Sequence, residues 1–279
     1  MSDQTMVGRT VLVTGASDGI GAEAARAVAG KGATVWVTGR SAAKLAPIAE
    51  AVGTEPLIAD FSRLDDVRRL AAEVAERVDG LDLLMNNAGG TFAPRTLTSD
   101  GHEPNFQVNH LAPFLLTNLL RPQLAAAGSS LVLNTSSVGN LMGKVVLDDL
   151  DYEHRRAIEL VAYGTGKLMN IMFTRGIAQR WTDDGIVSAA VHPGPAGSSF
   201  GRDSWLVGLA YRSPLKRFAT ISVADGAAPL IVLAERGADP EVNGRYFSRF
   251  KIDGHENKQA HDQALIDGLW ERSAALVGI

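Results

Sequence analysis

The stretch TGASDGIG, residues 14–21, follows a short apolar run and precedes a run in which alanines recur at helical spacing. This order predicts a strand over 10–14, a tight turn and then a helix. Three glycines in the turn, Gly15, Gly19 and Gly21, permit a sharp backbone reversal and close packing of the helix on the strand. The stretch therefore predicts the first strand-turn-helix unit of an α/β fold.

The same alternation continues along the chain. Further apolar runs predict strands at 33–39, 56–60, 81–89, 130–136 and 185–193, and an edge strand at 244–247. Helices are predicted at 41–51, 63–79, about 101–127 and about 158–182. Nearly continuous apolar strands joined by helices indicate a parallel sheet, because parallel strands need crossover connections. We therefore expect an α/β fold with a Rossmann-type doubly wound parallel β-sheet of about seven strands, helices on both faces, and a single domain over 1–279.

Composition limits the kinds of chemistry and partner. The 279 residues include 27 basic and 31 acidic side chains, a formal net charge of −4, and no basic block that could follow a nucleic-acid backbone. Zero cysteines exclude disulfides and thiolate chemistry, and the six histidines show no spacing typical of metal ligands. The first residues do not resemble a signal peptide, and no apolar run approaches the length of about 20 residues that a membrane span needs. We expect a cytoplasmic protein with no metal site and neither a nucleic-acid nor a membrane partner.

The turn at 14–21 also offers a binding site. The helix that follows presents unpaired N–H groups and the positive end of its dipole, both of which attract phosphate. A glycine-rich turn at the first strand of such a sheet is typical of dinucleotide binding, with an ordinary strand-helix turn as the alternative. The residues of the turn predicted to bind the dinucleotide are Gly15, Ser17, Asp18, Gly19, Ile20 and Gly21.

Arg40 indicates which dinucleotide binds. The second predicted strand ends in VTGR, so Gly39 and Arg40 stand where NAD(H)-binding proteins place a carboxylate for the ribose 2′-hydroxyl. An arginine there can pair with the 2′-phosphate of NADP(H). Asp18 opposes this electrostatically, and an exposed arginine that merely covers the end of the sheet is the alternative. We predict NADP(H) as the cofactor, with NAD(H) as the alternative.

Tyr163 and Lys167 lie four residues apart in the segment AYGTGK and so share one face of the helix predicted over about 158–182. The ordinary pKa of tyrosine is about 10, and an ammonium group at about 4 Å would lower it by favouring the phenolate. Such a tyrosine can act as a general acid and base. A solvated helix face that carries both side chains is the alternative. Gly164 and Gly166 weaken a helix and suggest that another group, such as a nicotinamide ribose, approaches closely.

A known family shows these motifs in the same order. They are TGASDGIG, NNAG (86–89), Asn109, Ser137 and the Tyr163/Lys167 pair, and with them the chain resembles the short-chain dehydrogenase/reductase family. The resemblance spans nearly the whole chain, and DGHEPNFQVNHLAPFLLTNLL and LWERSAALVG are similar to the retinol-dehydrogenase-like branch. It implies an NAD(P)-dependent oxidoreductase that interconverts an alcohol and a ketone or aldehyde by hydride transfer. The alternative is a catalytically weak NAD(P)-binding scaffold or redox sensor.

The resemblance implies roles for particular residues. Tyr163 would be the general acid and base, assisted by Lys167, Ser137 and Asn109 as the other catalytic residues. Of two adjacent serines, Ser137 is preferred because SVGNLMG follows it, and Ser136 is the alternative. The further cofactor-binding residues that the resemblance implies, besides Tyr163 and Lys167, are Asp60, Phe61, Asn87, Ala88, Gly89, Pro193 and Ser198.

Pro113 supports an inference from spacing about Asn109. Proline has no N–H group, so Pro113 cannot donate to the carbonyl of residue 109, one helical turn earlier. The free carbonyl could bind a water in a proton relay from Lys167 towards solvent, the role that the family gives to this asparagine. A simple kink in the helix is the alternative.

The substrate pocket is expected near 138–162 and 195–220, the segments that build it in the family. The second segment contains four large apolar or aromatic side chains, Phe200, Trp205, Leu206 and Tyr211. They suggest a small apolar carbonyl or alcohol substrate, and an amphipathic helix packed on the core is the alternative reading of their spacing.

Two positions depart from the family, and its assembly adds one expectation. The family more often has serine where Gly166 stands, and the branch usually has an apolar residue where Pro195 stands. The resemblance also implies a homodimer or homotetramer, formed through the helices at about 101–127 and 158–182.

Overall fold

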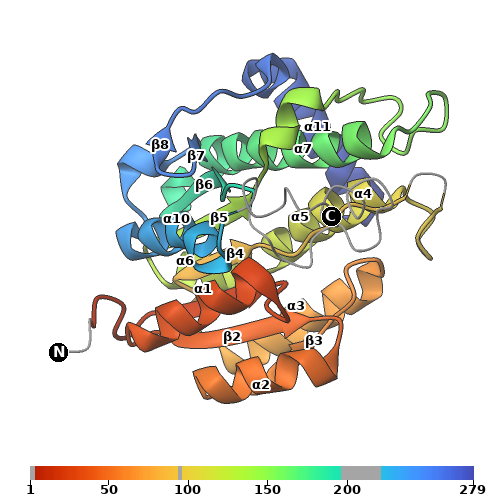
Figure 1. The fold of residues 1–279 in the computed structure, drawn as a ribbon. Helices are drawn as coiled ribbons and strands as arrows, with labels where there is room; N and C mark the ends of the chain where they lie inside the picture. Colours follow the sequence, from red (N-terminus) through yellow and green to blue (C-terminus); the bar gives the residue numbers. More distant parts are fainter. Residues whose placement is uncertain (1–3, 94–95, 196–220) are drawn as a thin grey trace.

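The computed structural model describes residues 4–93, 96–195 and 221–279, and within them eight strands form one sheet (Figure 1). The strands follow the order β3-β2-β1-β4-β5-β6-β7-β8. Their bounds are β1 Thr10–Thr14, β2 Thr34–Gly39, β3 Pro56–Ile58, β4 Leu83–Asn86, β5 Ser130–Thr135, β6 Ile186–His192, β7 Arg245–Ser248 and β8 Lys251–Ile252. Every neighbouring pair is parallel except β7 and β8, which are antiparallel. The predicted doubly wound parallel sheet is confirmed.

Helices cover both faces of the sheet. Their bounds are α1 Gly19–Gly30, α2 Ala42–Val52, α3 Leu64–Arg77, α4 Pro104–Phe106, η1 Gln107–Leu111, α5 Ala112–Leu119, α6 Arg121–Ala126, η2 Val138–Met142, α7 Glu159–Arg180, η3 Thr182–Asp184, α10 Val223–Arg236, η4 Pro240–Val242, η5 Lys258–His261 and α11 Gln263–Val277. Successive strand residues point to opposite faces. Leu12 of β1 therefore packs with α3, α5 and α7, whereas Val11 and Val13 pack with α1, α2 and α10. Single-domain organisation over 1–279 stays a prediction.

The edge of the sheet differs from the prediction by one short strand. The stretch 244–247, predicted as the last edge strand, contributes to β7, and β8 pairs with β7 on its outer side. β8 has only two residues, Lys251 and Ile252, and both are exposed. Two exposed residues give no apolar pattern, so the sequence does not reveal this strand.

The helix predicted over about 101–127 is interrupted in the structure. It consists of α4, the π-helical turn η1, α5 and α6. The Ala112 N–H donates to the Gln107 carbonyl, five residues earlier, which widens the helix just before Pro113. A second break falls at Leu120, because Pro122 in the first turn of α6 cannot continue the preceding helix. The helix is therefore irregular in the turn before Pro113, which is where the missing N–H group of this proline was expected to disturb the hydrogen bonds.

The two last long helices, α10 and α11, were not predicted. α10 packs beside α1, and α11 packs on α5 and α7. Trp270 of α11 contacts the rings of Phe114, Phe173 and Trp181, with centroid separations of 5.1, 5.7 and 5.5 Å. α11 thus covers part of the helices through which assembly was expected, and the homodimer or homotetramer stays a prediction. Among the helices of the described ranges, none combines the length and apolar character of a membrane span.

Candidate active site

A cavity of about 490 Å³ opens at the carboxyl ends of β1, β2, β4, β5 and β6. This is the edge at which doubly wound sheets bind ligands. The predicted site residues that line it are Gly15, Ser17, Asp18, Gly19, Ile20, Gly21, Arg40, Asp60, Phe61, Asn87, Ala88, Gly89, Ser137, Tyr163, Lys167 and Pro193. Asn109 is fully buried behind this wall, and Ser198 lies outside the described residues, as do Phe200, Trp205, Leu206 and Tyr211. One cavity therefore gathers residues that are widely separated in the sequence.

The glycine turn is shaped by close contacts within the protein. Gly15 has a φ of +66°, a conformation that other residues rarely adopt, and a side chain there would lie 2.7 Å from the Ala88 Cα. A Cβ at Gly21 would overlap the Gly15 carbonyl oxygen, so α1 packs closely on the turn that follows β1. Asp18 caps α1, since its Oδ1 accepts from the Gly19 N–H at 2.7 Å.

The segment after β4 is fastened to the end of β1. The N–H groups of Asn87 and Ala88 both donate to the Thr14 hydroxyl oxygen, at 3.0 and 2.9 Å. The Asn87 side chain donates to the carbonyl oxygens of Thr14 and Gly15, at 3.1 and 3.3 Å. These bonds bring the NNAG segment against the glycine turn and so form one continuous wall of the cavity.

The end of β2 carries positive charge. Arg40 and Lys44 are exposed and line the cavity, and Ser41 lines it between them. Sequence reasoning missed Lys44, although its place one turn into the helix after Arg40 was the available signal. Asp60 is oriented by the start of the next segment, because its Oδ1 accepts from both the N–H and the hydroxyl of Ser62.

The residues present fit a nicotinamide dinucleotide. Four hydroxyl oxygens of cavity-lining residues, those of Ser17, Thr38, Thr91 and Thr135, are buried and have no hydrogen-bond partner among the described residues. Buried hydroxyls are normally hydrogen-bonded, so these atoms are suited to contact a polar ligand. Together with the helix N-terminus at Gly19 they suit a phosphate-bearing ligand, and Arg40 and Lys44 suit a further phosphate.

The two adjacent serines, Ser136 and Ser137, differ in burial and in hydrogen bonding. Ser136 is buried, and its hydroxyl donates to the backbone carbonyl of Lys167 at 2.8 Å. Ser137 is half-buried and caps η2, with its Oγ accepting from the Gly139 N–H at 3.1 Å. An oxygen that accepts one hydrogen bond can still donate its own proton into the cavity. Both serines line the cavity, and the choice of Ser137 over Ser136 as the catalytic serine stays a prediction.

Tyr163 and Lys167 lie on the same face of α7 and line the same cavity. The Lys167 Nζ is 5.8 Å from the centroid of the Tyr163 ring. The Lys167 ammonium is buried, and its Nζ donates to the Thr135 carbonyl at 3.1 Å. Burial lowers the pKa of Lys167 to about 8, so the ammonium still predominates at neutral pH. A buried cation beside a phenol is an arrangement that can stabilise the phenolate.

Both glycines of α7 lie close to backbone of other segments. A Cβ at Gly164 would overlap the Gly139 carbonyl oxygen, and a Cβ at Gly166 would lie 2.8 Å from the Asn105 carbonyl oxygen. The protein's own backbone therefore makes a close approach to both glycines, and the expectation of a nicotinamide ribose against them stays a prediction. Gly164 brings the loop after Ser137 directly onto the helix of Tyr163.

Asn109 lies behind Gly89 and Gly90 rather than in the cavity wall. Its side chain accepts from the Gly90 N–H at 3.0 Å and donates to the Gly90 carbonyl at 2.9 Å. A Cβ at Gly89 would lie 2.5 Å from the Asn109 Oδ1 and 3.0 Å from the Lys167 Nζ, so both side chains meet behind this residue. The water relay from the Asn109 carbonyl stays a prediction.

Asn105, one turn before Asn109, repeats this pairing and was missed. It accepts from the Phe92 N–H at 3.0 Å and donates to the Phe92 carbonyl at 3.1 Å. Two amides one helical turn apart thus pair with backbone two residues apart, at Gly90 and Phe92. The repeated Asn spacing was visible in the sequence, but its partner segment was not.

His192, the last residue of β6, lines the cavity and was also missed, although it stands in the VHPG stretch. Burial, with a smaller contribution from the Arg249 guanidinium, lowers the pKa of His192 to about 4. The imidazole is therefore neutral at physiological pH and adds no charge to the cavity.

Comparison with known proteins gives one consistent family. The family model described as short chain dehydrogenase matches residues 9–205. A protein of Streptomyces sp. (strain C5), provisionally named a daunorubicin C-13 ketoreductase, is 40% identical over 277 residues, which cover 97% of this chain and 93% of that protein. Retinol dehydrogenase 13 of Homo sapiens is 34% identical over 293 residues, covering 100% of this chain and 87% of that protein. The crystal structure of an uncharacterised protein from Mycobacterium paratuberculosis superimposes with a TM-score of 0.79 at 30% identity, covering 98% of this chain and 94% of that chain.

Proposed function

This chain belongs to the short-chain dehydrogenase family and to its retinol-dehydrogenase-like branch, and from that premise we propose that it is an NADP(H)-dependent oxidoreductase. The family consists of oxidoreductases that act on alcohol and carbonyl groups with a nicotinamide cofactor. The proposed reaction is the interconversion of an alcohol with a ketone or aldehyde. The observation that carries it is the meeting of Ser137, Tyr163 and Lys167 in one cavity beside the glycine turn.

When bound, NADPH would supply the hydride in reduction and NADP would accept it in oxidation, while the protein donates or accepts the accompanying proton. In reduction, Tyr163 donates its phenolic proton to the carbonyl oxygen, and in oxidation it accepts the proton of the alcohol. The Lys167 ammonium stabilises the phenolate that results, and its burial strengthens this effect because little water screens it. Ser137 donates a hydrogen bond to the same oxygen and stabilises the negative charge that develops there.

The proposed substrate is a small apolar carbonyl or alcohol compound. Exposed apolar side chains surround Ser137 and the start of α7, namely Val138, Leu141, Met142, Ile158 and Leu160. Val138 lines the cavity, so an apolar substrate could reach the reacting atoms along this surface. The names of the relatives, which refer to a retinol dehydrogenase and to a daunorubicin ketoreductase, agree with a substrate that carries an alcohol or a ketone.

A turnover assay tests the proposed function. The purified protein would be incubated with NADPH and a panel of apolar ketones and aldehydes, and with NADP and the matching alcohols, while the absorbance of the reduced nicotinamide is followed. Turnover of at least one pair, faster with NADP(H) than with NAD(H), supports the proposal. Tight NADPH binding without turnover of any compound would favour the scaffold or redox sensor instead.

Ser137→Ala is expected to lower kcat by about 10²-fold, because the carbonyl oxygen loses one stabilising donor. Ser136→Ala is the matched control, since it removes a hydroxyl at the adjacent position. Its hydroxyl bonds to the Lys167 carbonyl, so we expect a loss of about 1 kcal/mol in the free energy of unfolding and less than about tenfold in kcat. Steady-state kinetics and urea unfolding measure both effects. The reverse order of the two kcat values would assign the catalytic role to Ser136.

Arg40→Ala is expected to raise the KM for NADPH by about tenfold and to leave the KM for NADH within about twofold. The reason is that a guanidinium bonds to a 2′-phosphate, which NADH lacks, through charge-assisted hydrogen bonds. Arg63→Ala is the control for general loss of positive charge. Arg63 is an exposed arginine at the start of α3 and does not line the cavity. Undiminished preference for NADPH in Arg40→Ala would remove Arg40 from the cofactor site.

A further inference from the structure

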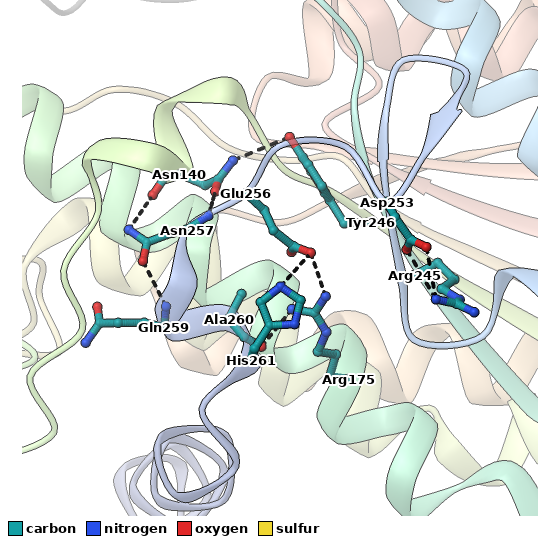
Figure 2. Close-up of polar contacts among 10 residues, drawn as sticks. All are labelled: Asn140, Arg175, Arg245, Tyr246, Asp253, Glu256, Asn257, Gln259, Ala260 and His261. Atoms are coloured by element: carbon teal, nitrogen blue, oxygen red, sulfur yellow. Dashed lines mark hydrogen bonds and ion pairs between the residues drawn. The ribbon is translucent and has the colours of Figure 1, made fainter.

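The segment between β8 and α11 lies against the loop that follows Ser137 (Figure 2). We infer that Asn140 and Asn257, one from each segment, form a positioning pair that fixes the place of Ser137 relative to Tyr163. This inference rests on the proposed function, in which the Ser137 hydroxyl contacts the reacting oxygen. Neither asparagine lines the cavity, so both act through Ser137.

Asn140 binds the backbone of Ser137 twice. Its N–H donates to the Ser137 carbonyl at 3.0 Å, and its side-chain Nδ2 donates to the same oxygen at 2.7 Å. The Asn140 side chain is fully buried, so no water competes for these bonds. The carbonyl of Ser137 follows directly from the Cα that carries its hydroxyl, and a fixed carbonyl therefore limits where the hydroxyl can point.

Asn257 determines the orientation of the Asn140 amide. The Asn257 N–H donates to the Asn140 Oδ1 at 2.9 Å. Because an N–H group needs an acceptor, the oxygen of the Asn140 amide must face Asn257, and the Nδ2 must then face the Ser137 carbonyl. The Asn257 side chain adds two bonds, donating to the carbonyls of Asn140 at 3.2 Å and of Gly143 at 2.8 Å. The two asparagines thus bind one another through hydrogen bonds, and the Asn140 Nδ2 remains directed at the Ser137 carbonyl.

Asn257 is itself anchored. Its Oδ1 accepts from the Gln259 N–H at 3.0 Å, and the Gln259 side chain pairs with the N–H and the carbonyl of Val145, at 2.9 and 3.0 Å. Figure 2 shows the second anchor, the buried carboxylate of Glu256 facing Arg175 of α7, with an Arg175 Nη2 to Oε1 distance of 2.8 Å. A buried charge-assisted bond of this kind is strong and directional.

These contacts connect Ser137 to the helix of Tyr163 by two routes. One is direct, through the contact of the Gly139 carbonyl with Gly164. The other runs from Ser137 through Asn140 and Asn257 to the neighbouring Glu256, whose carboxylate binds Arg175 on α7. Displacement of a catalytic group by about 1 Å can lower a rate by about 10²-fold. Loss of the second route is therefore expected to lower kcat by a measurable amount.

A double-mutant cycle tests the inference. Asn257→Ala keeps the backbone bond to the Asn140 Oδ1 but removes the two side-chain bonds to the carbonyls of Asn140 and Gly143, and it is expected to lower kcat by about tenfold, with the KM for NADPH within about twofold. Asn140→Ala is expected to lower kcat more, by about 30-fold. In a Ser137→Ala background both substitutions should change kcat by less than about threefold, because the group they position is absent. An undiminished effect in that background would overturn the inference by showing a general structural role.

Asn243→Ala is the matched control. This asparagine lies between η4 and β7, and its side chain also makes two bonds, accepting from the Ser188 N–H near the start of β6 at 3.1 Å and donating to the Thr182 hydroxyl of η3 at 3.0 Å. It should lower the free energy of unfolding by about 1 kcal/mol without lowering kcat. If Asn140→Ala does not fold, Asn257→Ala and its double variant still complete the cycle.

Crystal structures of the wild type and of Asn257→Ala separate failure of this inference from failure of the proposed function. A displaced Ser137 Oγ in the variant supports the positioning pair, even where the wild type turns over no compound and the proposed function fails. An unmoved Ser137 Oγ overturns the positioning pair, even where the wild type is active.

Discussion

Tyr163→Phe is expected to lower turnover by about 10³-fold in both directions while the dissociation constant for NADPH stays within about twofold. The substitution removes one oxygen and leaves the ring, whose Cε1 would lie 3.1 Å from a Cβ placed at Gly139, so the ring packs closely on this glycine. The reaction cannot proceed without a proton for the carbonyl oxygen, and Tyr163 is the phenol that lines the cavity beside Ser137 and Lys167. The expected loss is therefore in kcat and not in cofactor binding.

Tyr152→Phe is the matched control for Tyr163→Phe. The Tyr152 hydroxyl donates to the Thr165 hydroxyl of α7 at 2.8 Å, so it also lies against this helix, but it does not line the cavity. Its loss should lower the free energy of unfolding by about 1 kcal/mol and leave kcat within about twofold. Steady-state kinetics and NADPH fluorescence titration measure both variants. Retention of more than about a tenth of wild-type turnover in Tyr163→Phe would exclude Tyr163 as the general acid and base.

Local patterns were enough to predict most of the fold. The strand-turn-helix order around Gly15 repeats through the first half of the chain, and each repeat carries its own apolar periodicity. The failures were local conflicts, one very short strand, and the two long helices α10 and α11, which were not predicted. Pro113 and Pro122 broke a helix that periodicity alone would continue, and β8 was too short to give any pattern.

Local patterns were not enough to predict which groups meet. The glycine at 164 was visible, but the Gly139 carbonyl that requires it lies 25 positions away in sequence and on a different element. Asn257 is a polar residue in a short connection, and nothing near it in the sequence points to Asn140. Such contacts depend on how distant segments pack, which no short window contains.

Lys167→Met is expected to abolish most turnover and, at pH 7, to raise the free energy of unfolding of the cofactor-free protein by about 3 kcal/mol. The Lys167 ammonium is fully buried, and burial lowers its pKa from 10.5 to about 8. This difference is the cost of placing the charge in a site with little water, and it corresponds to about 3 kcal/mol. Methionine has a similar length and no charge. The Thr135 carbonyl would still accept from Asn170 at 3.1 Å, so the substitution leaves no buried acceptor unpaired.

Because the pKa of Lys167 is lower in the folded protein than in the unfolded chain, the wild type and Lys167→Met should differ in how their free energy of unfolding depends on pH. Between pH 8 and 10.5 the unfolded chain binds a proton at Lys167 that the folded protein has largely released, so wild-type stability from this group rises with pH in that window. Below pH 8 both states carry the proton and the whole cost is present. The stability advantage of Lys167→Met should therefore be constant below pH 8, shrink as the pH rises, and nearly vanish by about pH 10.5.

Urea unfolding at pH 7 and at pH 10 measures this advantage, with Lys251→Met as the control. Lys251 is an exposed lysine of β8, and its substitution should change stability little at either pH. A Lys167→Met variant that is less stable than the wild type at pH 7, or whose stability difference does not depend on pH, would contradict the buried-charge argument. The expected result has a functional meaning, because a residue that lowers stability wherever it is charged is retained for what the charge does. Here the charge lies beside the phenol of Tyr163, the group that we propose exchanges the proton.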